Sequence, residues 1–332
     1  MSFKKKIRYL KKTEIDDLQK FIDSNYSKDH ILSKNKKIIF FYYNYKKKKK
    51  LDFLGYFENN KLLGIAGIIK LNNWDHNLSK NYYLSLLVKN KSLTKEITFS
   101  FFNFIFKKIK PDLFACSGFN KNIKKIYKKI GKIKKFSHFY IYNTKIKKGL
   151  SKNLKKIIIK DKLKNHNIKI EETNTLNEIP YSKYYPTKSK DYFINKYIKN
   201  PFYKYTFLKI KKKNNTLFFF VIRKIKIKNK NRIVRIVDFY GNINKEIYIG
   251  NIIKKYLEIN KFEYIDFLCI GLNKSLLQNI GFNLKKNNQL IPNYFEPLIK
   301  KNITLELCVF NNNFKNYIFF KGDGDQDRPN LL

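Results

Sequence analysis

Apolar and polar residues repeat with two different periods along the chain, and these periods predict the order of its elements. Short apolar or alternating runs indicate strands, whereas apolar residues three and four positions apart indicate helices. The first half follows the order β-α-β-β-β-α-β-α-β. Strand-like runs occupy residues 38–45, 51–72 and 81–88, the second of them folded at a tight hairpin turn, Glu58-Asn59-Asn60. Residues 94–108 have the i, i+4 apolar rows of a helix with one buried face, and Pro111 ends it.

One strand-to-helix segment occurs twice. "DLFACSGFNKNIKKIYKKIG" (Asp112–Gly131) is an apolar strand, a glycine turn and a helix for which Gly131 is the expected C′ residue. "DFLCIGLNKSLLQNIGF" (Asp266–Phe282) repeats this pattern at an offset that aligns Cys116 with Cys269. Similar elements flank both copies, which predicts two α/β domains. We place them at residues 1–150 and 151–332, the second ending in the GDGDQDRPN segment.

This order of elements resembles the GNAT N-acyltransferase superfamily, once in each half. The resemblance implies an α/β (α+β) fold with two tandem GNAT-like domains, each built on a mixed, mostly antiparallel sheet. In that family acyl-CoA lies in a notch where two central strands splay apart. The segments "INKYIKNPFYKYTFLKI", "RIVDFYG", "YIDFLCIG", "IPNYFEP" and "FKGDGDQDRPN" are further similar to tandem GNAT-like proteins associated with bacterial surface-polysaccharide gene clusters.

The resemblance implies roles for residues of the repeated segment. Tyr127 matches the tyrosine that protonates the leaving thiolate in many GNAT enzymes, but its place on an apolar helix face also fits a core residue. Leu277 occupies the matching position of the second copy. Asn120 and Asn273 could contact the pantetheine arm, although an N-cap explains both.

The expected phosphate-binding loop is unusual. In the first half it corresponds to Lys89–Glu96, which contains no glycine, so Lys89, Lys91 or Lys95 would supply part of the attraction for the pyrophosphate. In the second half it is Gly241–Gly250, whose two glycines are nine positions apart. Acetyl-CoA or another acyl-CoA is nevertheless the expected donor.

The C-terminal segment concentrates acidic residues between glycines and a proline. Asp323, Asp325 and Asp327 fall at alternate positions and precede Arg328. Alternate residues of an extended chain point the same way, so this segment could attract an amine and accept its proton. The alternative is a set of surface ion pairs with lysines. Further substrate-binding candidates are Glu296 of "NYFEP", Asp238 of "RIVDFYG" and Trp74 in "WDH", which could also be an aromatic plug.

Composition limits the function classes. The formal net charge is +47, but only five of the 72 basic residues are arginine, so an A+T-rich genome explains the charge better than nucleic-acid binding. Accordingly "KKKKK" (Lys46–Lys50) is expected to be a solvated loop. The longest apolar runs have six residues, too few for a membrane span, and no signal peptide is recognised. Three cysteines in apolar runs indicate buried thiols in a cytoplasmic protein.

These observations predict an enzyme that transfers an acyl group from acyl-CoA to an amine, with an amino sugar for surface polysaccharide as acceptor. Two alternatives stay open: a tRNA-dependent aminoacyl transferase of the peptidoglycan-bridge type, and an inactive tandem fold that serves as a binding module. No metal is expected, because the four histidines are scattered and the aspartate segment lacks the glycine and glutamate of an EF-hand.

Overall fold

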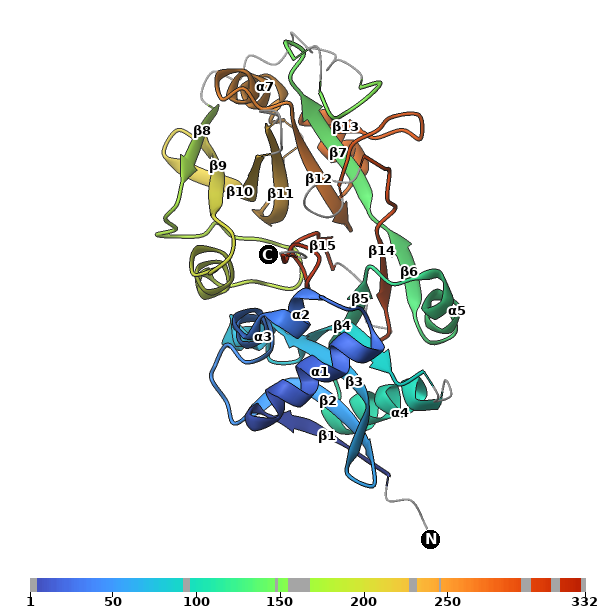
Figure 1. Ribbon diagram of the computed structural model, residues 1–332. Helices are drawn as coiled ribbons and strands as arrows, with labels where there is room; N and C mark the ends of the chain where they lie inside the picture. Colours follow the sequence, from blue (N-terminus) through green and yellow to red (C-terminus); the bar gives the residue numbers. More distant parts are fainter. Residues whose placement is uncertain are drawn as a thin grey trace. The chain divides into compact units, whose positions relative to one another are not determined.

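The chain folds into two compact units. The computed structural model describes residues 5–91, 96–146, 149–154, 168–226, 232–244, 246–293, 300–311 and 317–329. The first unit comprises Met1–Ile133, Leu307–Phe314 and Gly324–Leu332, and the second comprises Lys134–Glu306 and Lys315–Asp323. Figure 1 shows the elements of both. Two short segments near the C-terminus, Leu307–Phe314 and Gly324–Leu332, thus belong to the first unit, whereas the predicted boundary at residue 150 assigns them to the second domain.

The first unit is built on a seven-stranded mixed sheet of order β1-β2-β3-β4-β5-β14-β6. Its strands are β1 (Lys5–Lys11), β2 (Lys50–Glu58), β3 (Lys61–Lys70), β4 (Asn81–Lys89), β5 (Leu113–Ser117), β14 (Glu306–Val309) and β6 (Lys132–Lys135). β4 and β5 are parallel, whereas β1–β2, β2–β3, β3–β4 and β5–β14 are antiparallel. The sheet is therefore mixed and mostly antiparallel, as predicted.

Helices cover both faces of this sheet. They are α1 (Ile15–Asn25), α2 (Ile31–Lys34), α3 (Lys36–Tyr43), α4 (Glu96–Phe104), which continues as the π-turn η4 (Ile105–Ile109), and α5 (Lys121–Ile130). Three short turns, η1 (Lys12–Glu14), η2 (Leu71–Asn73) and η3 (His76–Leu78), complete the set. Because side chains alternate along a strand, Leu84 of β4 joins the core beneath α4 and α5, whereas Ser85 bonds Tyr43 of α3. The two faces of β4 thus meet different helices.

The run at residues 38–45 is not a strand. Residues 36–43 form α3, and the side chain of Asn35 caps it by accepting a hydrogen bond from the Ile38 amide. Five of its eight residues are buried, so the helix is apolar almost all round. A short, continuous apolar run fits a buried helix as well as a strand, and periodicity alone cannot separate the two.

The second unit is built on an eight-stranded sheet of order β13-β7-β12-β11-β10-β9-β8 on its main path, with β15 paired to β12. Its strands are β7 (Ser137–Tyr142), β8 (Ile168–Thr173), β9 (Tyr205–Lys212), β10 (Asn215–Lys226), β11 (Arg232–Gly241), β12 (Tyr264–Ile270), β13 (Asn283–Leu284) and β15 (Phe319–Phe320). Its helices are α6 (Lys190–Phe193), η5 (Ile194–Ile198), α7 (Gly250–Ile259) and α8 (Lys274–Asn279). An apolar core joins α7 and α8 to the sheet.

The two sheets exchange strands. β7 follows α5 along the chain, yet it pairs with β12 of the second unit, where Ser137 lies opposite Cys269. β14 follows α8, yet it pairs with β5 of the first unit, where Cys308 lies opposite Cys116. The sheet of the second unit therefore contains a strand that follows α5 of the first unit along the chain. The sheet of the first unit contains a strand that follows α8 of the second unit.

The sequence repeat forms two corresponding strand-to-helix corners. β5 and β12 each run parallel to the preceding central strand, and Gly118 (φ +72°) and Gly271 (φ +92°) each make the turn that follows. Gly131 differs from the prediction, because its backbone is extended (φ −160°) rather than left-handed. A side chain there would lie 2.7 Å from the Cys308 Sγ, so the glycine permits close packing of β14.

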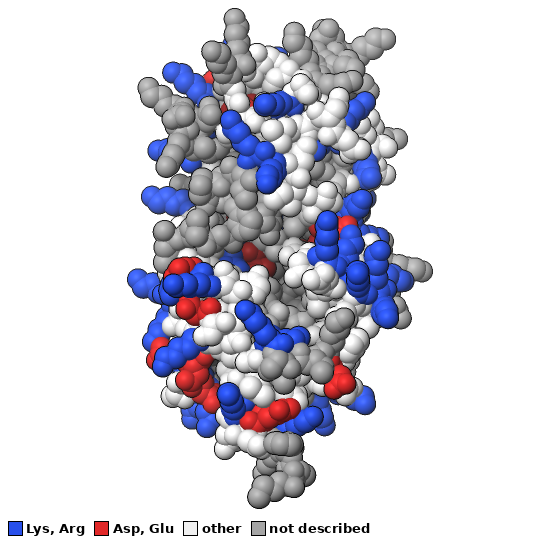
Figure 2. Space-filling view, turned by 45° about the vertical axis from the view of Figure 1, so that its right-hand side comes forward, with Lys and Arg blue, Asp and Glu red and all other residues white. Residues whose placement is uncertain are grey.

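The lysine surplus is spread over the surface. Figure 2 shows Lys and Arg side chains over most of the visible face, with acidic side chains among them in places. Lys46–Lys50 are all exposed, and the first four form a solvated loop as expected, whereas Lys50 begins β2. None of the described helices is long and apolar enough to cross a membrane.

Candidate functional site

The first unit contains a notch where its two parallel strands separate. β4 and β5 pair from Asn81↔Leu113 to Leu84↔Cys116, after which β4 continues to Lys89 without pairing to β5. The gap opens into a cavity of about 310 Å³. Its lining comes from β4, the end of β5 and the start of α5, together with Tyr26 and Thr98. We call this cavity the first notch.

Tyr127 lies on the α5 side of the first notch. Its ring is 2% exposed and packs against Phe102, Phe119 and Phe310. The Cys116 thiol neighbours its hydroxyl. Burial, and then the neighbouring Cys116 thiol, hold the pKa of Tyr127 well above its usual value of 10. This tyrosine therefore keeps its proton near neutral pH.

Both asparagines of the repeat are N-caps. Asn120 Oδ1 accepts hydrogen bonds from the amides of Asn122 and Ile123, each at 3.0 Å. Asn273 Oδ1 accepts one from Leu276, also at 3.0 Å. Capping thus accounts for both residues, although only Asn120 also lines the first notch.

The two lysines predicted to bind the donor are placed differently. Lys89 lines the first notch and is partly buried, at the end of β4. Lys91 is exposed and is not among the residues that line the notch. Residues 92–95, which include Lys95 and the middle of the predicted phosphate loop, lie outside the described residues.

The corresponding gap in the second unit is filled by the chain itself. β11 and β12 pair in parallel from Val234↔Ile265 to Ile236↔Phe267. Beyond that point β15 pairs with Cys269 and Ile270 of β12. On the other side, the Gly322 amide donates a 2.7 Å hydrogen bond to Val237 of β11. Residues 319–322 therefore bridge the two strands and occupy the place that is open in the first unit.

A buried ionic cluster holds this inserted segment. Lys188 Nζ lies 2.7 Å from Asp238 Oδ1 and 3.3 Å from Asp323 Oδ1, and Tyr197 donates a 2.7 Å hydrogen bond to Asp238. These four side chains are at most 2% exposed. Burial opposes the charge on Lys188, but its two carboxylate partners outweigh burial and raise its pKa. Asp238, predicted to bind substrate, and Asp323, predicted to be catalytic, are therefore ion-paired inside the second unit.

The other half of the acidic segment belongs to the first unit. Asp325 Oδ2 accepts a 3.0 Å hydrogen bond from Arg328 Nε, and Arg328 Nη2 lies 3.3 Å from His30 Nε2. Gln326 donates to the carbonyl of Ser117, at the end of β5. The charge of Asp325 acts on the Cys116 thiol at the first notch. The Asp325–Arg328 turn therefore adjoins the notch, and Asp327 is buried in the same segment.

Trp74 is buried away from the first notch. It is 1% exposed, and its ring packs against Phe41 and Tyr42 of α3. It is not among the residues that line the described cavities. This position fits the aromatic plug that the sequence left as an alternative. Glu296 lies outside the described residues.

Sequence reasoning missed several residues at the first notch. Tyr43 and Ser85 share a 2.7 Å hydrogen bond on the face opposite Tyr127, and Ser85 lines the notch. His30 caps α2 and lies beside Arg328. No local pattern marked these three, because the residues that bring them together are far away in the sequence. Cys116 was visible only through its alignment with Cys269.

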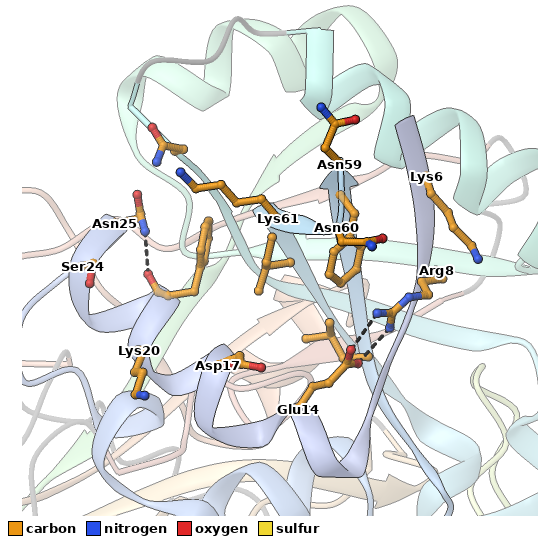
Figure 3. Close-up of a pocket in the computed structure, with 15 residues that line it drawn as sticks. Lys6, Arg8, Glu14, Asp17, Lys20, Ser24, Asn25, Asn59, Asn60 and Lys61 are labelled. Atoms are coloured by element: carbon orange, nitrogen blue, oxygen red, sulfur yellow. Dashed lines mark hydrogen bonds and ion pairs between the residues drawn. The ribbon is translucent and has the colours of Figure 1, made fainter. Parts of the chain in front are cut away.

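A larger groove lies elsewhere in the first unit. It has a volume of about 1050 Å³ and is bordered by β1, α1 and the β2–β3 turn (Figure 3). Arg8 and Glu14 form a bidentate ion pair inside it, with N–O distances of 2.8 and 2.6 Å. The lining contains no tyrosine, cysteine or histidine and none of the predicted site residues. We therefore place the candidate site at the first notch.

The fold is shared with solved structures. A GCN5-related N-acetyltransferase (GNAT) from Anabaena variabilis ATCC 29413 is similar with a TM-score of 0.52 and 11% identity, over 93% of this chain and 73% of that chain. A conserved protein from Enterococcus faecalis V583, described as "Probable N-Acyltransferase", gives a TM-score of 0.50 and 8% identity, also over 93% and 73%. The fold is that of the GNAT N-acyltransferases, in tandem.

At these identities the likeness concerns the fold. The sequence matches no protein-family model, and no curated protein is similar to it by sequence. Within the described parts of the chain, no group of three His, Cys, Asp or Glu side chains is arranged to hold a metal ion.

Proposed function

We propose that the protein is an N-acyltransferase that binds acyl-CoA in the first notch and transfers the acyl group to an amine. The observation that supports this most is the separation of β4 from β5 after Leu84↔Cys116, which leaves an open cavity beside Tyr127. Among the described residues of the second unit, the equivalent gap is filled, because residues 319–322 bridge β11 and β12. We therefore assign donor binding to the first unit.

The first notch suits the pantetheine arm and thioester of the donor. Its walls include Leu84, Leu86 and Leu87 of β4, and the edge of β4 beyond Leu84 is not paired with β5. Backbone N–H and C=O groups on such an edge can bond the amides of an extended ligand. Lys89, at the end of β4, would attract the pyrophosphate.

Groups on the two faces of the sheet would serve different steps of the reaction. As the amine nitrogen forms its bond to the acyl carbon, the carbon–sulfur bond breaks and the sulfur leaves as a thiolate. We assign Tyr127, on the α5 face, to protonate that thiolate, because its hydroxyl is the acid that lines the notch on this face. The amine would approach from the α1–α3 face, where Ser85 lines the notch.

Asp325 is our candidate for handling the amine proton. Arg328 Nε bonds its Oδ2, and Gln326 Nε2 lies 3.4 Å from its Oδ1, which is long for a hydrogen bond. Oδ1 can therefore accept a proton or a hydrogen bond from the acceptor amine. Asp323 we assign to anchoring the inserted segment of the second unit, because it is ion-paired with Lys188.

The acceptor we propose is the amino group of a nucleotide-linked sugar used for surface polysaccharide. It follows from the resemblance of the C-terminal segments to tandem GNAT-like proteins of such gene clusters, and it would place the enzyme in the cytoplasm with its donor.

Thermal-shift titration and a thiol-release assay test the proposal together. Acetyl-CoA at 100 times its Kd should stabilise the protein by about 2.7 kcal/mol. UDP-amino sugars added with acetyl-CoA should then give free CoA and an N-acetyl product. Stabilisation by charged tRNA alone would favour an aminoacyl transferase instead. Stabilisation by none of these ligands would favour an inactive binding module.

A further inference from the structure

Two of the three cysteines face each other across paired strands, and one of them, Cys116, lines the first notch. Cys116 of β5 and Cys308 of β14 are register partners in an antiparallel pair. Directly opposite residues point to the same face of a sheet, and both cysteines belong to the core beneath α4 and α5. Both are free thiols. They are 192 positions apart in the sequence, and only the strand exchange brings them together.

The spacing of such partners is close to that of a disulfide. Opposite Cα atoms in an antiparallel pair are about 4.5 to 5.5 Å apart, within the range of about 4.4 to 6.8 Å that disulfides span. Opposite Cβ atoms are about 4.5 to 5.5 Å apart, so closing the bond to the usual separation of about 3.8 Å needs a shift of about 1 Å. A bond formed with such strain is readily reduced.

Both sulfur atoms lie against α5, each beside a different part of Tyr127. The Cys116 thiol neighbours the Tyr127 hydroxyl, and the Cys308 Sγ lies 3.8 Å from the Tyr127 carbonyl oxygen. Gly131 leaves room for the Cys308 sulfur, because a Cβ on that glycine would lie 2.7 Å from it. Cys116 also lines the first notch, which gives small molecules a route to one of the two thiols.

We propose that Cys116 and Cys308 form a reversible disulfide when a small-molecule disulfide enters the first notch. The Cys116 thiolate attacks the small disulfide, forms a mixed disulfide and releases one thiolate. The Cys308 thiolate then attacks the Cys116 sulfur and releases the second thiolate. Overall the protein loses two protons and two electrons, and the small disulfide is reduced to two thiols. Burial raises the pKa of both cysteines, so the exchange is slow.

The second unit contains a matched control. Cys269 corresponds to Cys116 in the sequence repeat, but its β7 partner is Ser137. Oxidation of the folded protein should therefore link Cys116 to Cys308 and leave Cys269 reduced. The Ser137→Cys variant places a second thiol opposite Cys269 and tests whether cross-strand geometry alone is sufficient.

The experiment treats the reduced, folded full-length protein with 2-hydroxyethyl disulfide, alkylates the remaining thiols in denaturant and maps the peptides by mass spectrometry. We expect a linked Cys116–Cys308 peptide that dithiothreitol cleaves, an alkylated Cys269, and no link in Cys308→Ser. The link should raise Tm by about 5 to 10 °C under non-reducing conditions. Three alkylated cysteines after oxidation, or equal linkage through Cys269, would overturn the proposal.

The effect on acyl transfer rests on the proposed function. A disulfide removes the Cys116 thiol from the Tyr127 hydroxyl and draws β5 toward β14, so transfer should fall on oxidation and recover with dithiothreitol. A linked protein with unchanged transfer would refute this effect and leave the disulfide site standing. The Cys269→Ser variant should show the same loss and recovery as the unmodified protein.

Discussion

Asp325 accepts a 3.0 Å hydrogen bond from Arg328, three residues further along a tight turn, and both side chains are at most 8% exposed. Two positions earlier, Asp323 is paired with Lys188 in the other unit. The acidic segment of the sequence is therefore divided between two places, and its aspartates cannot share one role.

Variants of Asp325 and Arg328 distinguish a chemical role of the Asp325 carboxylate from a role in neutralising Arg328. Asp325→Asn should abolish transfer, but it also leaves Arg328 buried without its carboxylate, which costs about 3 to 5 kcal/mol of unfolding free energy. The double variant Asp325→Asn/Arg328→Gln restores the charge balance and should regain most of that stability. Transfer should stay at least 100-fold reduced in the double variant, with acetyl-CoA binding retained in the thermal-shift assay. Recovery of transfer would show that Asp325 serves only to neutralise Arg328.

Tyr127→Phe tests the proton donor. Removing the hydroxyl should lower kcat by about 100-fold or more, because general acid catalysis contributes about 10² to 10⁴ in rate. The lost polar contact with the Cys116 thiol should cost only about 1 kcal/mol in the free energy of unfolding. Steady-state kinetics and urea unfolding measure the two effects. If kcat fell together with a large fall in the free energy of unfolding, the hydroxyl would act through stability and not through chemistry. A stable variant with full kcat would also reject the assignment.

Filling the notch should block the donor. Ile126 lines the first notch, and Leu276 is its counterpart in the sequence repeat. Ile126→Trp adds an indole to the cavity and should weaken acetyl-CoA binding at least tenfold, measured by isothermal titration calorimetry. Leu276→Trp is the matched control and should leave binding unchanged, because residues 319–322 already fill the second gap. The reverse result would move the donor site to the second unit.

His30 gives the first unit a pH-dependent contribution to stability. Burial and the charge of Arg328 lower its pKa from 6.5 to about 4. The unfolded chain therefore binds this proton below about pH 6.5, while the folded protein resists it down to about pH 4. The contribution is complete above pH 6.5 and is lost as the pH falls toward 4.

His30→Asn tests this contribution. Asparagine can still cap α2 by accepting from the Leu32 amide, as His30 does. The urea midpoint of the natural protein should fall more between pH 7 and pH 5 than that of the variant. Equal falls would mean that His30 is protonated freely in the folded state.

The sequence by itself determined the local units. The apolar runs, the two asparagine caps and the turn glycines Gly118 and Gly271 specify the strand-to-helix corners, because these signals act within a few residues. The position of Tyr127 on the apolar face of α5 follows from the same local pattern. The apolar run of α3 could not be assigned from the local pattern, because burial on nearly all sides removes the periodicity that distinguishes a helix from a strand.

Only the tertiary structure decided which strands pair and which notch stays open. Pairing between strands far apart in the sequence depends on side-chain packing and burial, which the local pattern does not record. For this reason the exchange of β7 and β14, the insertion of residues 319–322 beside β12, and the meeting of Cys116 with Cys308 were not visible in the sequence. The division of the aspartates has the same cause, because the chain passes from one unit to the other between Asp323 and Gly324.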